Sequence, residues 1–441
     1  MILCWITETR VRDFEPRFLT ACQLSELGFT SLVGRRESIK PWVMRNKFPV
    51  MWIDKSVGGV SAEEEDHIVK NGGFGICLDE EGGIYPENRY HSAIEKRFPK
   101  GSVSERQIYW AWGSKQANLM RGLPERFSSD QVMITGNPRF DLCKKELAGY
   151  HADLDQEISK LRPYILINTK FTPCNSRIYN GKQLTNDQRK SIEQSKMDMK
   201  SYFELISNLS KRYPDLNILI RPHPVEIAAT YKDKFTLVPN VFVDDGRRPI
   251  SRSSSCAKIV IHLDCTTAIE ALFSGHHPIS YLPNGVYAGT QTLPVEISEV
   301  TYTEDEVFRA IERRLIADPP TAAIQRALAK CAPVIANVQG TFLDRVRPVF
   351  ERVDDIVSFR KEELNLLGAT DRRRISQILA KQRLLRLTGK SQRKEPKFPP
   401  HNACEIEKLV LNGAAHRLVP RRAHCRWLSE TLVSVEPSRQ P

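Results

Sequence analysis

Short apolar runs alternate with longer amphipathic stretches along most of the chain, and the alternation restarts once. Such runs fit buried strands, and the stretches between them fit helices that cover a parallel sheet. The sequence therefore predicts two doubly wound α/β domains, residues 1–150 and 151–350, that face each other across a cleft. The first series of predicted strands is 2–7, 30–34, 49–53, 73–78, 107–112 and 131–135, and the second is 164–170, 217–221, 241–243, 258–262 and 277–282.

The composition excludes several classes of protein. Hydrophobic residues make up 41% of the 441 residues and charged residues 27%, which fits neither a disordered nor a fibrous chain. No apolar run approaches the ~20 residues of a spanning helix, and the first ten residues lack the basic start of a secretory signal. We therefore expect a soluble, cytoplasmic protein.

Cysteines and acidic residues give no sign of a metal centre. The ten cysteines are scattered without a C-x-x-C pair, and the acidic pairs at 244–245 and 354–355 are adjacent rather than spaced as ligands. We expect no disulfide framework, no metal ion and no cofactor.

The positive charge is concentrated near the C-terminus. The chain carries +12 at pH 7, and residues 355–441 hold 18 Lys and Arg against 9 Asp and Glu. The sequence predicts a basic helical extension over residues 351–441, with helices at 354–367 and 372–387 and an irregular tail. An anionic membrane surface or a partner protein suits such an extension. Nucleic acid is a weaker expectation, because no aromatic-interleaved motif accompanies the charge.

A predicted buried strand ends in the motif Arg221-Pro-His223-Pro. The two prolines fix the backbone, while the Arg221 guanidinium offers a planar fork of donors and His223 adds a titratable one. The carboxyl end of a strand is where the anionic part of a nucleotide lies in such folds. The motif predicts a phosphate-binding turn; the alternative is a capping turn that carries a surface arginine and histidine.

A second group of polar residues follows the strand predicted at 258–262. Hydroxyls and free backbone N–H groups at the start of the next helix favour an anion, and a carboxylate one turn later can accept hydrogen bonds from a ribose diol. The alternative is a core histidine, a capping threonine and a solvated glutamate. The predicted nucleotide-binding residues of this group are His262, Thr266, Thr267 and Glu270.

These motifs together resemble one family. Besides the RPHP turn, the segments 78–82 (LDEEG), 132–142 (VMITGNPRFDL) and 397–399 (KFP) are similar to stretches of bacterial surface carbohydrate biosynthesis proteins and of related capsule sugar and polyol-phosphate transferases. The resemblance covers roughly residues 2–410. It implies a GT-B fold, with a saccharide or lipid-linked acceptor on the N-terminal side and a nucleotide-activated sugar donor on the C-terminal side.

The resemblance implies a glycosyltransferase that moves a CMP- or nucleoside-diphosphate-linked sugar onto a bacterial surface polysaccharide, such as capsule or lipopolysaccharide, or onto its lipid-linked precursor. Such an enzyme would work in the cytoplasm, at the inner face of the membrane if the basic extension binds there. Two alternatives stay open. One is a nucleotide-sugar epimerase or hydrolase of the same architecture, and the other is a non-catalytic scaffold of envelope polysaccharide assembly.

Sugar transfer requires a carboxylate near the anomeric carbon, as a general base or as a nucleophile. Glu80 and Glu81 lie in an acidic turn after a predicted strand, and Glu8 at the end of the first strand competes with them. The alternative for the acidic turn is a solvated loop. We expect metal-independent chemistry, in which cationic side chains and helix N-termini stabilise the leaving phosphate.

Four further residues are predicted to contact substrate. Arg12 follows Glu8 and could orient an anionic acceptor, while Asn137 and Arg139 belong to a turn that would project the arginine toward the cleft. The alternative for Arg139 is a domain-closing turn in which it pairs with Asp141 or another acid. Asn168 precedes a loop that would line the donor pocket.

Overall fold

The structure is a computed structural model, and it describes residues 1–55, 62–80, 84–85, 89–98, 107–176, 178, 183–244, 246, 248–287, 290, 292–351, 403–420, 423–429 and 432–437. The chain forms two compact units. Unit 1 consists of Met1–Gly83, Asn88–Leu142 and Ala332–Pro441, and unit 2 of Ile84–Glu87 and Cys143–Cys331. The chain returns to unit 1 after Cys331, whereas the sequence analysis expects the second domain to continue to residue 350.

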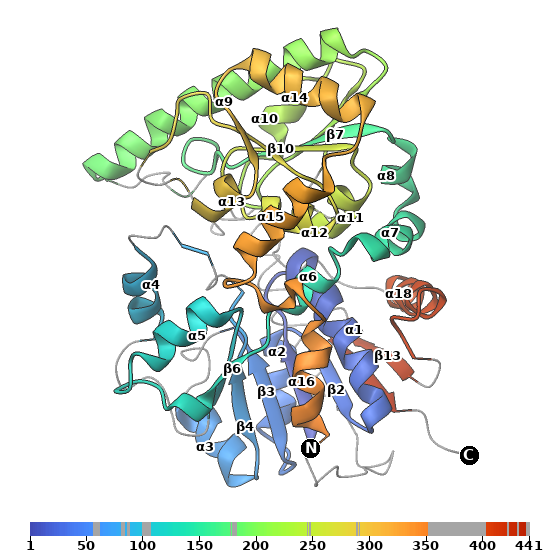
Figure 1. Cartoon of the computed structure of the whole chain (residues 1–441). Helices are drawn as coiled ribbons and strands as arrows, with labels where there is room; N and C mark the ends of the chain where they lie inside the picture. The colour runs from blue at the N-terminus through green and yellow to red at the C-terminus, as the bar shows by residue number, and fades with distance from the viewer. Residues whose placement is uncertain are drawn as a thin grey trace. The chain divides into compact units, whose positions relative to one another are not determined.

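Unit 1 is built on an eight-stranded sheet of order β13-β14-β2-β1-β3-β4-β5-β6 (Figure 1). Strands β1 to β6 are parallel. The strand order reverses at β1, because β2 pairs with one of its edges and β3 with the other. The six parallel strands are β1 (Ile2–Ile6), β2 (Thr30–Gly34), β3 (Val50–Asp54), β4 (Phe74–Cys77), β5 (Gln107–Ala111) and β6 (Val132–Ile134).

Helix α1 of unit 1 links β1 to β2 as the sequence predicts. Pro16 stands in its first turn, where a missing N–H costs no hydrogen bond. The helix ends before Gly28, whose φ of 88° is the left-handed conformation that glycine adopts most readily. The helices of unit 1 are α1 (Glu15–Leu24), α2 (Arg36–Val43), α3 (Ala62–Lys70), α4 (Tyr90–Arg97), α5 (Ser114–Arg121), α6 (Pro138–Asp141), α16 (Phe342–Phe350) and α18 (Ala403–Ala415), with a π-turn at Arg10–Phe14 before α1.

The C-terminal residues complete the sheet of unit 1. Strands β13 (Ala423–Ser429) and β14 (Leu432–Pro437) form an antiparallel hairpin, and β14 pairs antiparallel with β2, so that Val433 faces Val33. The expectation of an irregular tail is therefore wrong for these two strands. Leu432, Val433 and Val435 are buried, so apolar burial holds the hairpin on β2. The helices predicted at 354–367 and 372–387 lie outside the described residues.

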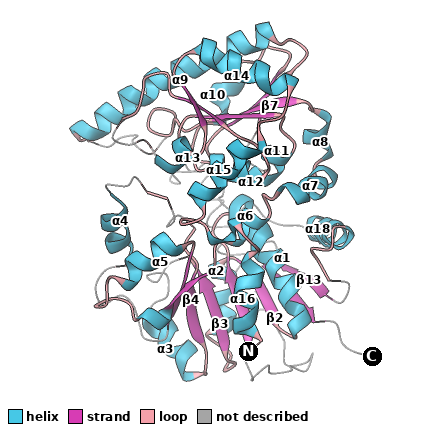
Figure 2. Ribbon diagram, in the orientation of Figure 1, coloured by secondary structure: helices cyan, strands magenta, loops and turns pink. Residues whose placement is uncertain are grey.

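Unit 2 contains a six-stranded parallel sheet of order β12-β11-β10-β7-β8-β9. Figure 2 shows β7, one of its strands, together with helices of the unit. The strand order of this sheet reverses at β7, which pairs with β8 on one side and β10 on the other. This is the order of dinucleotide-binding folds, in which ligands bind beyond the strand ends at the point of reversal. The strands are β7 (Tyr164–Asn168), β8 (Asn217–Arg221), β9 (Val241–Val243), β10 (Ile259–His262), β11 (Ile279–Tyr281) and β12 (Glu299–Thr301). The sequence analysis predicts the first five and misses β12.

Helices cover both faces of this sheet. Ile165 and Ile167 point to the face packed by Tyr202 and Leu205 of α9, while Leu166 points to the face packed by Ala271 of α12. The helices of unit 2 are α7 (Ala148–Leu154), α8 (Gln156–Lys160), α9 (Asn186–Arg212), α10 (Ala228–Lys234), α11 (Ile250–Ser255), α12 (Thr267–Phe273), α13 (Thr292–Glu296), α14 (Glu304–Ile316) and α15 (Thr321–Cys331). The prediction of a doubly wound α/β fold is confirmed for both units.

Candidate functional site

Two buried polar side chains lie side by side at the carboxyl ends of β7 and β8 in unit 2. Asn168 and Arg221 are register partners, so they share the face of the sheet that α12 covers. Asn168 is 1% exposed, and among the described residues neither its amide oxygen nor its amide nitrogen has a hydrogen-bond partner. Arg221 is 7% exposed and its Nε has no partner there either, although its other end donates to the Arg248 carbonyl at 3.3 Å. Buried polar groups are normally hydrogen-bonded, so the atoms without a partner among the described residues are candidates for contacts with a ligand.

Helix α12 adds a third such group to the same side of the sheet. Thr267 is one turn before Ala271, which packs on the sheet, and its buried hydroxyl has no hydrogen-bond partner within the described part of the chain. Thr266 is half-buried and its side chain makes no cap to the helix. Glu270 is buried on the same side as Thr267. The start of α12 thus brings Thr267 to the side of the sheet where Asn168 and Arg221 lie, and Glu270 follows about one helical turn later.

An ion pair crosses the point where the strand order of unit 2 reverses. Lys170 follows β7 and Asp264 follows β10, and Lys170 Nζ lies 2.9 Å from Asp264 Oδ1. Asp264 is fully buried, whereas the Lys170 side chain is 27% exposed. The ammonium group therefore has a fixed position and still reaches solvent. Lys170 is not among the residues predicted from the sequence, although a lysine directly after a buried strand is a signal that could have indicated it.

The turn after β8 is held by hydrogen bonds of its own. His223 Nδ1 accepts a hydrogen bond of 3.3 Å from the Val225 amide and lies 3.3 Å from the Thr172 hydroxyl. An imidazole that accepts through Nδ1 carries its proton on Nε2. His223 is half-buried in the turn that follows β8, and its contact with phosphate stays a prediction.

Glu226 ties the RPHP turn to the loop after β7. Its carboxylate accepts hydrogen bonds from the Thr169 hydroxyl at 2.7 Å, from the Phe171 amide at 2.6 Å and from the Tyr231 hydroxyl. Burial raises the pKa of Glu226 above its usual range, although these hydrogen bonds act in the opposite direction. Glu226, which the sequence analysis does not single out, thus fixes the positions of the loops that carry Lys170 and His223.

His262 is a core histidine. It is fully buried, its Nδ1 accepts from the Cys265 amide at 3.3 Å, and its Nε2 lies 2.9 Å from the Ser298 hydroxyl. Burial, with a smaller contribution from Lys170, lowers its pKa to about 3. Both ring nitrogens are used within the fold, so the predicted nucleotide contact of His262 is wrong.

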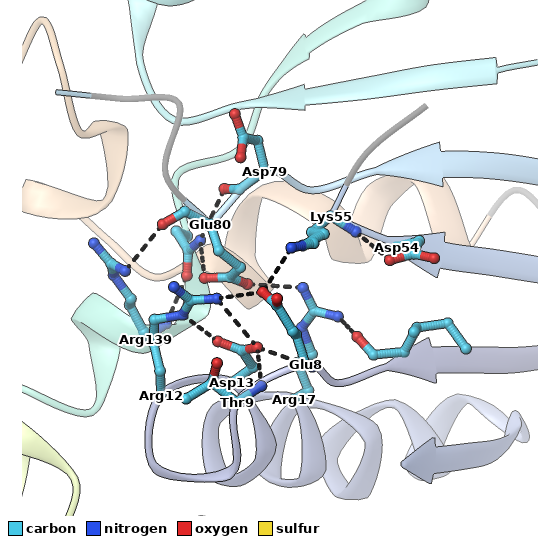
Figure 3. A network of polar contacts seen from close by, with 12 residues as sticks. Glu8, Thr9, Arg12, Asp13, Arg17, Asp54, Lys55, Asp79, Glu80 and Arg139 are labelled. Atoms are coloured by element: carbon cyan, nitrogen blue, oxygen red, sulfur yellow. Dashed lines mark hydrogen bonds and ion pairs between the residues drawn. The ribbon is translucent and has the colours of Figure 1, made fainter. Parts of the chain in front are cut away.

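Glu80 is a structural carboxylate of unit 1. Its Oε1 accepts from Arg17 at 2.7 Å and its Oε2 from Asn137 at 3.1 Å, and the Arg17 and Glu80 side chains are each 1% exposed. Glu80 is therefore not part of a solvated loop, because its side chain is buried among its partners (Figure 3). With both oxygens bound within unit 1, Glu80 is also a poor candidate for the catalytic carboxylate. Glu81 lies outside the described residues.

Asn137 and Arg139 also serve the fold. The Asn137 side chain caps α6 by accepting from the Arg139 amide, and its backbone exchanges hydrogen bonds with the Asn337 side chain. Arg139 is 9% exposed, donates to the Glu80 carbonyl at 3.2 Å and stacks 4.7 Å from the Trp112 ring centroid. Asn137 and Arg139 thus contribute to the packing of unit 1, and the Glu80 carbonyl is an acceptor for Arg139. Contact of either residue with substrate stays a prediction.

Glu8 is an accessible carboxylate at the carboxyl edge of the described part of unit 1. Its Oε2 lies 2.7 Å from Lys55, which follows β3, and 3.3 Å from Arg12 (Figure 3). The Glu8 side chain is 26% exposed. Beside it, the buried hydroxyl of Thr7 has no hydrogen-bond partner among the described residues. The Glu8–Lys55 pair spans the reversal point of this sheet, as the Lys170–Asp264 pair does in unit 2.

The described residues offer neither a metal-binding cluster nor a membrane-spanning helix. They contain no group of three or more His, Cys, Asp or Glu side chains that could hold a metal ion. Among the same residues, no helix is long and apolar enough to cross a membrane.

No protein-family model matches the chain, and no curated protein matches it. Among solved structures it is similar to UDP-GlcNAc 2-epimerase from Neisseria meningitidis bound to UDP-GlcNAc, with 12% identity and a TM-score of 0.45 over 74% of this chain and 94% of that one. S. aureus MnaA, solved with UDP, has 13% identity and a TM-score of 0.45 over 79% and 95% of the two chains. The wall teichoic acid polymerase TagF has 9% identity and a TM-score of 0.44 over 83% and 90%. The sequence identities to these structures are too low for the role of any residue to be transferred to this chain.

Proposed function

We propose that the protein is a glycosyltransferase that binds a nucleotide-activated sugar through unit 2 and transfers the sugar to a saccharide or lipid-linked acceptor of a bacterial surface polysaccharide. The observation that carries the proposal is the set of buried polar side chains at the carboxyl edge of the unit 2 sheet. Asn168, Arg221 and Thr267 have donors or acceptors without partners among the described residues. A nucleotide offers phosphate oxygens, hydroxyls and base edges that can satisfy all three.

In this proposal two cations hold the phosphate of the donor. Arg221 supplies guanidinium N–H groups from the end of β8, and Lys170 supplies the N–H groups that Asp264 does not occupy. His223 adds an imidazole N–H from the same edge. Fixed cations of this kind stabilise the negative charge that develops on the leaving phosphate. No metal ion enters the proposed chemistry.

Glu8 is the proposed catalytic carboxylate, because Glu80 has both oxygens occupied and Glu8 reaches solvent. As a general base it would take the proton of the acceptor hydroxyl while that oxygen bonds to the anomeric carbon. The bond from that carbon to the phosphate oxygen breaks, and the nucleotide leaves with the electron pair. The division of labour, with the acceptor on unit 1 and the donor on unit 2, is the one that the family resemblance implies.

Calorimetry of the full chain with UDP, CDP and CMP tests the donor site. Arg221→Ala and Asn168→Ala should each weaken binding of the preferred nucleotide, by about 10- to 150-fold for the arginine, since charge-assisted hydrogen bonds contribute about 1.5–3 kcal/mol. Arg212→Ala is the matched control, because Arg212 forms an exposed pair with Glu312 in the same unit. Binding that Arg221→Ala leaves unchanged would remove the proposed phosphate role.

Product analysis then separates transfer from the alternatives. A transferase turns over a nucleotide sugar appreciably when an acceptor is present. Epimerisation or hydrolysis of the nucleotide sugar without an acceptor would show that the protein is a nucleotide-sugar epimerase or hydrolase and not a transferase. Failure of the wild-type chain to bind any nucleotide or nucleotide sugar would favour the scaffold.

A further inference from the structure

Two cysteines from opposite ends of the chain lie in contact within unit 1. Cys22 belongs to α1 and Cys425 to β13, and their sulfur atoms are 3.7 Å apart although 403 positions separate them in the sequence. Cys22 is fully buried, whereas Cys425 is partly exposed. Cys425 is therefore the member of the pair that reaches solvent, and the Cys22 sulfur lies in contact with its sulfur.

Several contacts hold the two sulfur atoms together. The residues 403–437, here called the C-terminal segment, are attached to unit 1 by the pairing of β14 with β2. Helix α18 adds an ion pair of 2.8 Å between Glu405 and Arg10. The same helix packs closely on α1 at Gly413, where even an added Cβ atom would come within 3.5 Å of the Leu19 side chain. Cys22 and Cys425 are thus in contact because the C-terminal segment packs on α1, and not because they are close in the sequence.

We propose that Cys22 and Cys425 are a modification site, at which a low-molecular-weight disulfide such as oxidised glutathione converts the two thiols into an intramolecular disulfide. The sulfur atoms must approach by about 1.7 Å to reach the S–S distance of about 2.0 Å. Cys425 lies on the edge strand β13 of the sheet, so the approach requires movement of the hairpin and not of the core.

The reaction balances without a further reagent. The Cys425 thiolate attacks one sulfur of oxidised glutathione, which forms a mixed disulfide and expels one glutathione thiolate. Cys22 then loses its proton and attacks the Cys425 sulfur, which expels the second glutathione. In sum, two protein thiols are oxidised and one glutathione disulfide is reduced to two glutathione molecules.

The order of the two steps follows from burial. Burial and the neighbouring Cys425 sulfur raise the pKa of the Cys22 thiol well above its usual value, so that this cysteine is a poor first nucleophile. The second step is then the slower one, and its rate should rise with pH. The disulfide joins the C-terminal segment to α1, the helix that also carries Arg17, the partner of Glu80. This site is independent of the proposed sugar transfer.

Peptide mapping of the full chain tests the proposal. The protein is incubated with oxidised glutathione, alkylated and digested with trypsin without reduction, and a cross-linked product of peptides 18–35 and 423–426 is sought by mass spectrometry. We expect this product in the wild type and its loss after dithiothreitol. The unfolding temperature of the oxidised protein should rise by several degrees, because the bond closes a long loop of the unfolded chain.

Cys425→Ser and Cys404→Ser are the matched variants, since both change a cysteine of the C-terminal segment. Cys404 is exposed on α18 and serves as a reporter that the oxidant reacts. Cys404→Ser should retain the cross-link, and Cys425→Ser should lose both the cross-link and the rise in unfolding temperature. If Cys404 becomes glutathionylated while peptides 18–35 and 423–426 stay separate at pH 7 and at pH 8.5, the proposal is wrong.

Discussion

Lys170 and Asp264 join the two loops between which the strand order of unit 2 reverses, through an ion pair of 2.9 Å. Glu8 and Lys55 form the corresponding pair in unit 1, at 2.7 Å. In both units the pair therefore spans the position at which open α/β sheets bind ligands. The two pairs differ in burial. Asp264 is fully buried, whereas Glu8 and Lys55 both reach solvent.

Lys170→Met should affect stability and nucleotide binding together. Removing the lysine takes the ammonium group away from a fully buried carboxylate, which should lower the free energy of unfolding by about 2–3 kcal/mol, less than for a pair that is buried on both sides. Nucleotide affinity should fall about tenfold or more. Denaturant unfolding and calorimetry measure the two effects. Lys258→Met is the control, because Lys258 and Asp318 form a more exposed pair in the same unit, where the cost should stay below about 1 kcal/mol. An equal loss in the free energy of unfolding for Lys170→Met and Lys258→Met would contradict the proposal that Lys170 stabilises the buried charge of Asp264.

Substitution of Glu80 should affect mainly the stability of unit 1, whereas substitution of Glu8 should affect mainly the proposed transfer. Glu80→Gln breaks a pair whose partners are each 1% exposed, and should lower the free energy of unfolding by about 3 kcal/mol or more. Glu8→Gln removes an accessible carboxylate and should change the stability by less than about 1 kcal/mol. If the protein is a transferase, Glu8→Gln should also abolish transfer while nucleotide binding persists. A Glu8→Gln variant with normal transfer would exclude Glu8 as the catalytic group.

Acid should destabilise unit 2 through His262. The folded protein keeps this imidazole neutral down to a pKa of about 3, while the unfolded chain takes up a proton below about 6.5. The free energy of unfolding is therefore unaffected by the protonation of this histidine above pH 6.5. As the pH falls toward 3, the free energy of unfolding decreases by up to about 1.4 kcal/mol per pH unit. Urea unfolding between pH 6.5 and 5 should show this decrease. In His262→Asn the number of protons taken up on unfolding should be smaller by up to one, so the free energy of unfolding should depend less steeply on pH. Burial also lowers the pKa values of His276 and His277, so part of the slope should remain in the variant.

Removing residues 421–441 should destabilise unit 1. The truncation exposes the edge of β2 and removes the buried side chains of Leu432, Val433 and Val435. An uncovered edge strand promotes pairing between chains, so the truncated protein should aggregate during expression or unfold at a distinctly lower temperature. Size-exclusion chromatography and thermal unfolding would show this. A truncated chain that stays monomeric with an unchanged unfolding temperature would contradict the role of the hairpin.

Binding to an anionic membrane remains a prediction for the basic residues around 372–394, which lie outside the described residues. Truncation after residue 351 would also remove β14, so it cannot separate membrane binding from folding. Neutralising Arg372, Arg373 and Arg374 to Gln in the full chain is the better variant. Each basic residue near an anionic surface contributes about 1 kcal/mol, so co-sedimentation with phosphatidylserine vesicles at low salt should fall by about 100-fold or more in affinity. Wild-type protein that ignores the vesicles at low salt would end the membrane hypothesis.

The predicted strands agree with the structure because buried parallel strands are continuous apolar runs, and these runs are visible in the sequence. Strands β12 and β13 have no such run: Glu299–Thr301 is short, and Ala423–Ser429 mixes exposed with half-buried residues. Strand β14 alternates around Ser434, but its partner β2 is about 400 residues away. Pairing at that distance has no local signal.

The site is less predictable than the fold, because burial decides what each polar residue does. Arg221 and Glu80 both follow or end a strand, yet Arg221 has an unpartnered Nε within the described residues, whereas Glu80 is saturated by Arg17 and Asn137. Arg17 is remote in sequence from Glu80, so the sequence contains no sign that this acid is paired. Cys22 and Cys425 illustrate the same limit. Their separation of 403 positions hides a contact that packing creates.

The pairing of β14 with β2 has a consequence for the synthesis of the chain. Strand β2 leaves the ribosome early, but the residues that cover its edge are made about 400 positions later. At 5–20 residues per second, that edge stays open for roughly 20–80 s of translation. Over that time the growing chain carries a bare hydrogen-bonding edge, which a chaperone, or a neighbouring nascent chain on the same messenger RNA, can reach first.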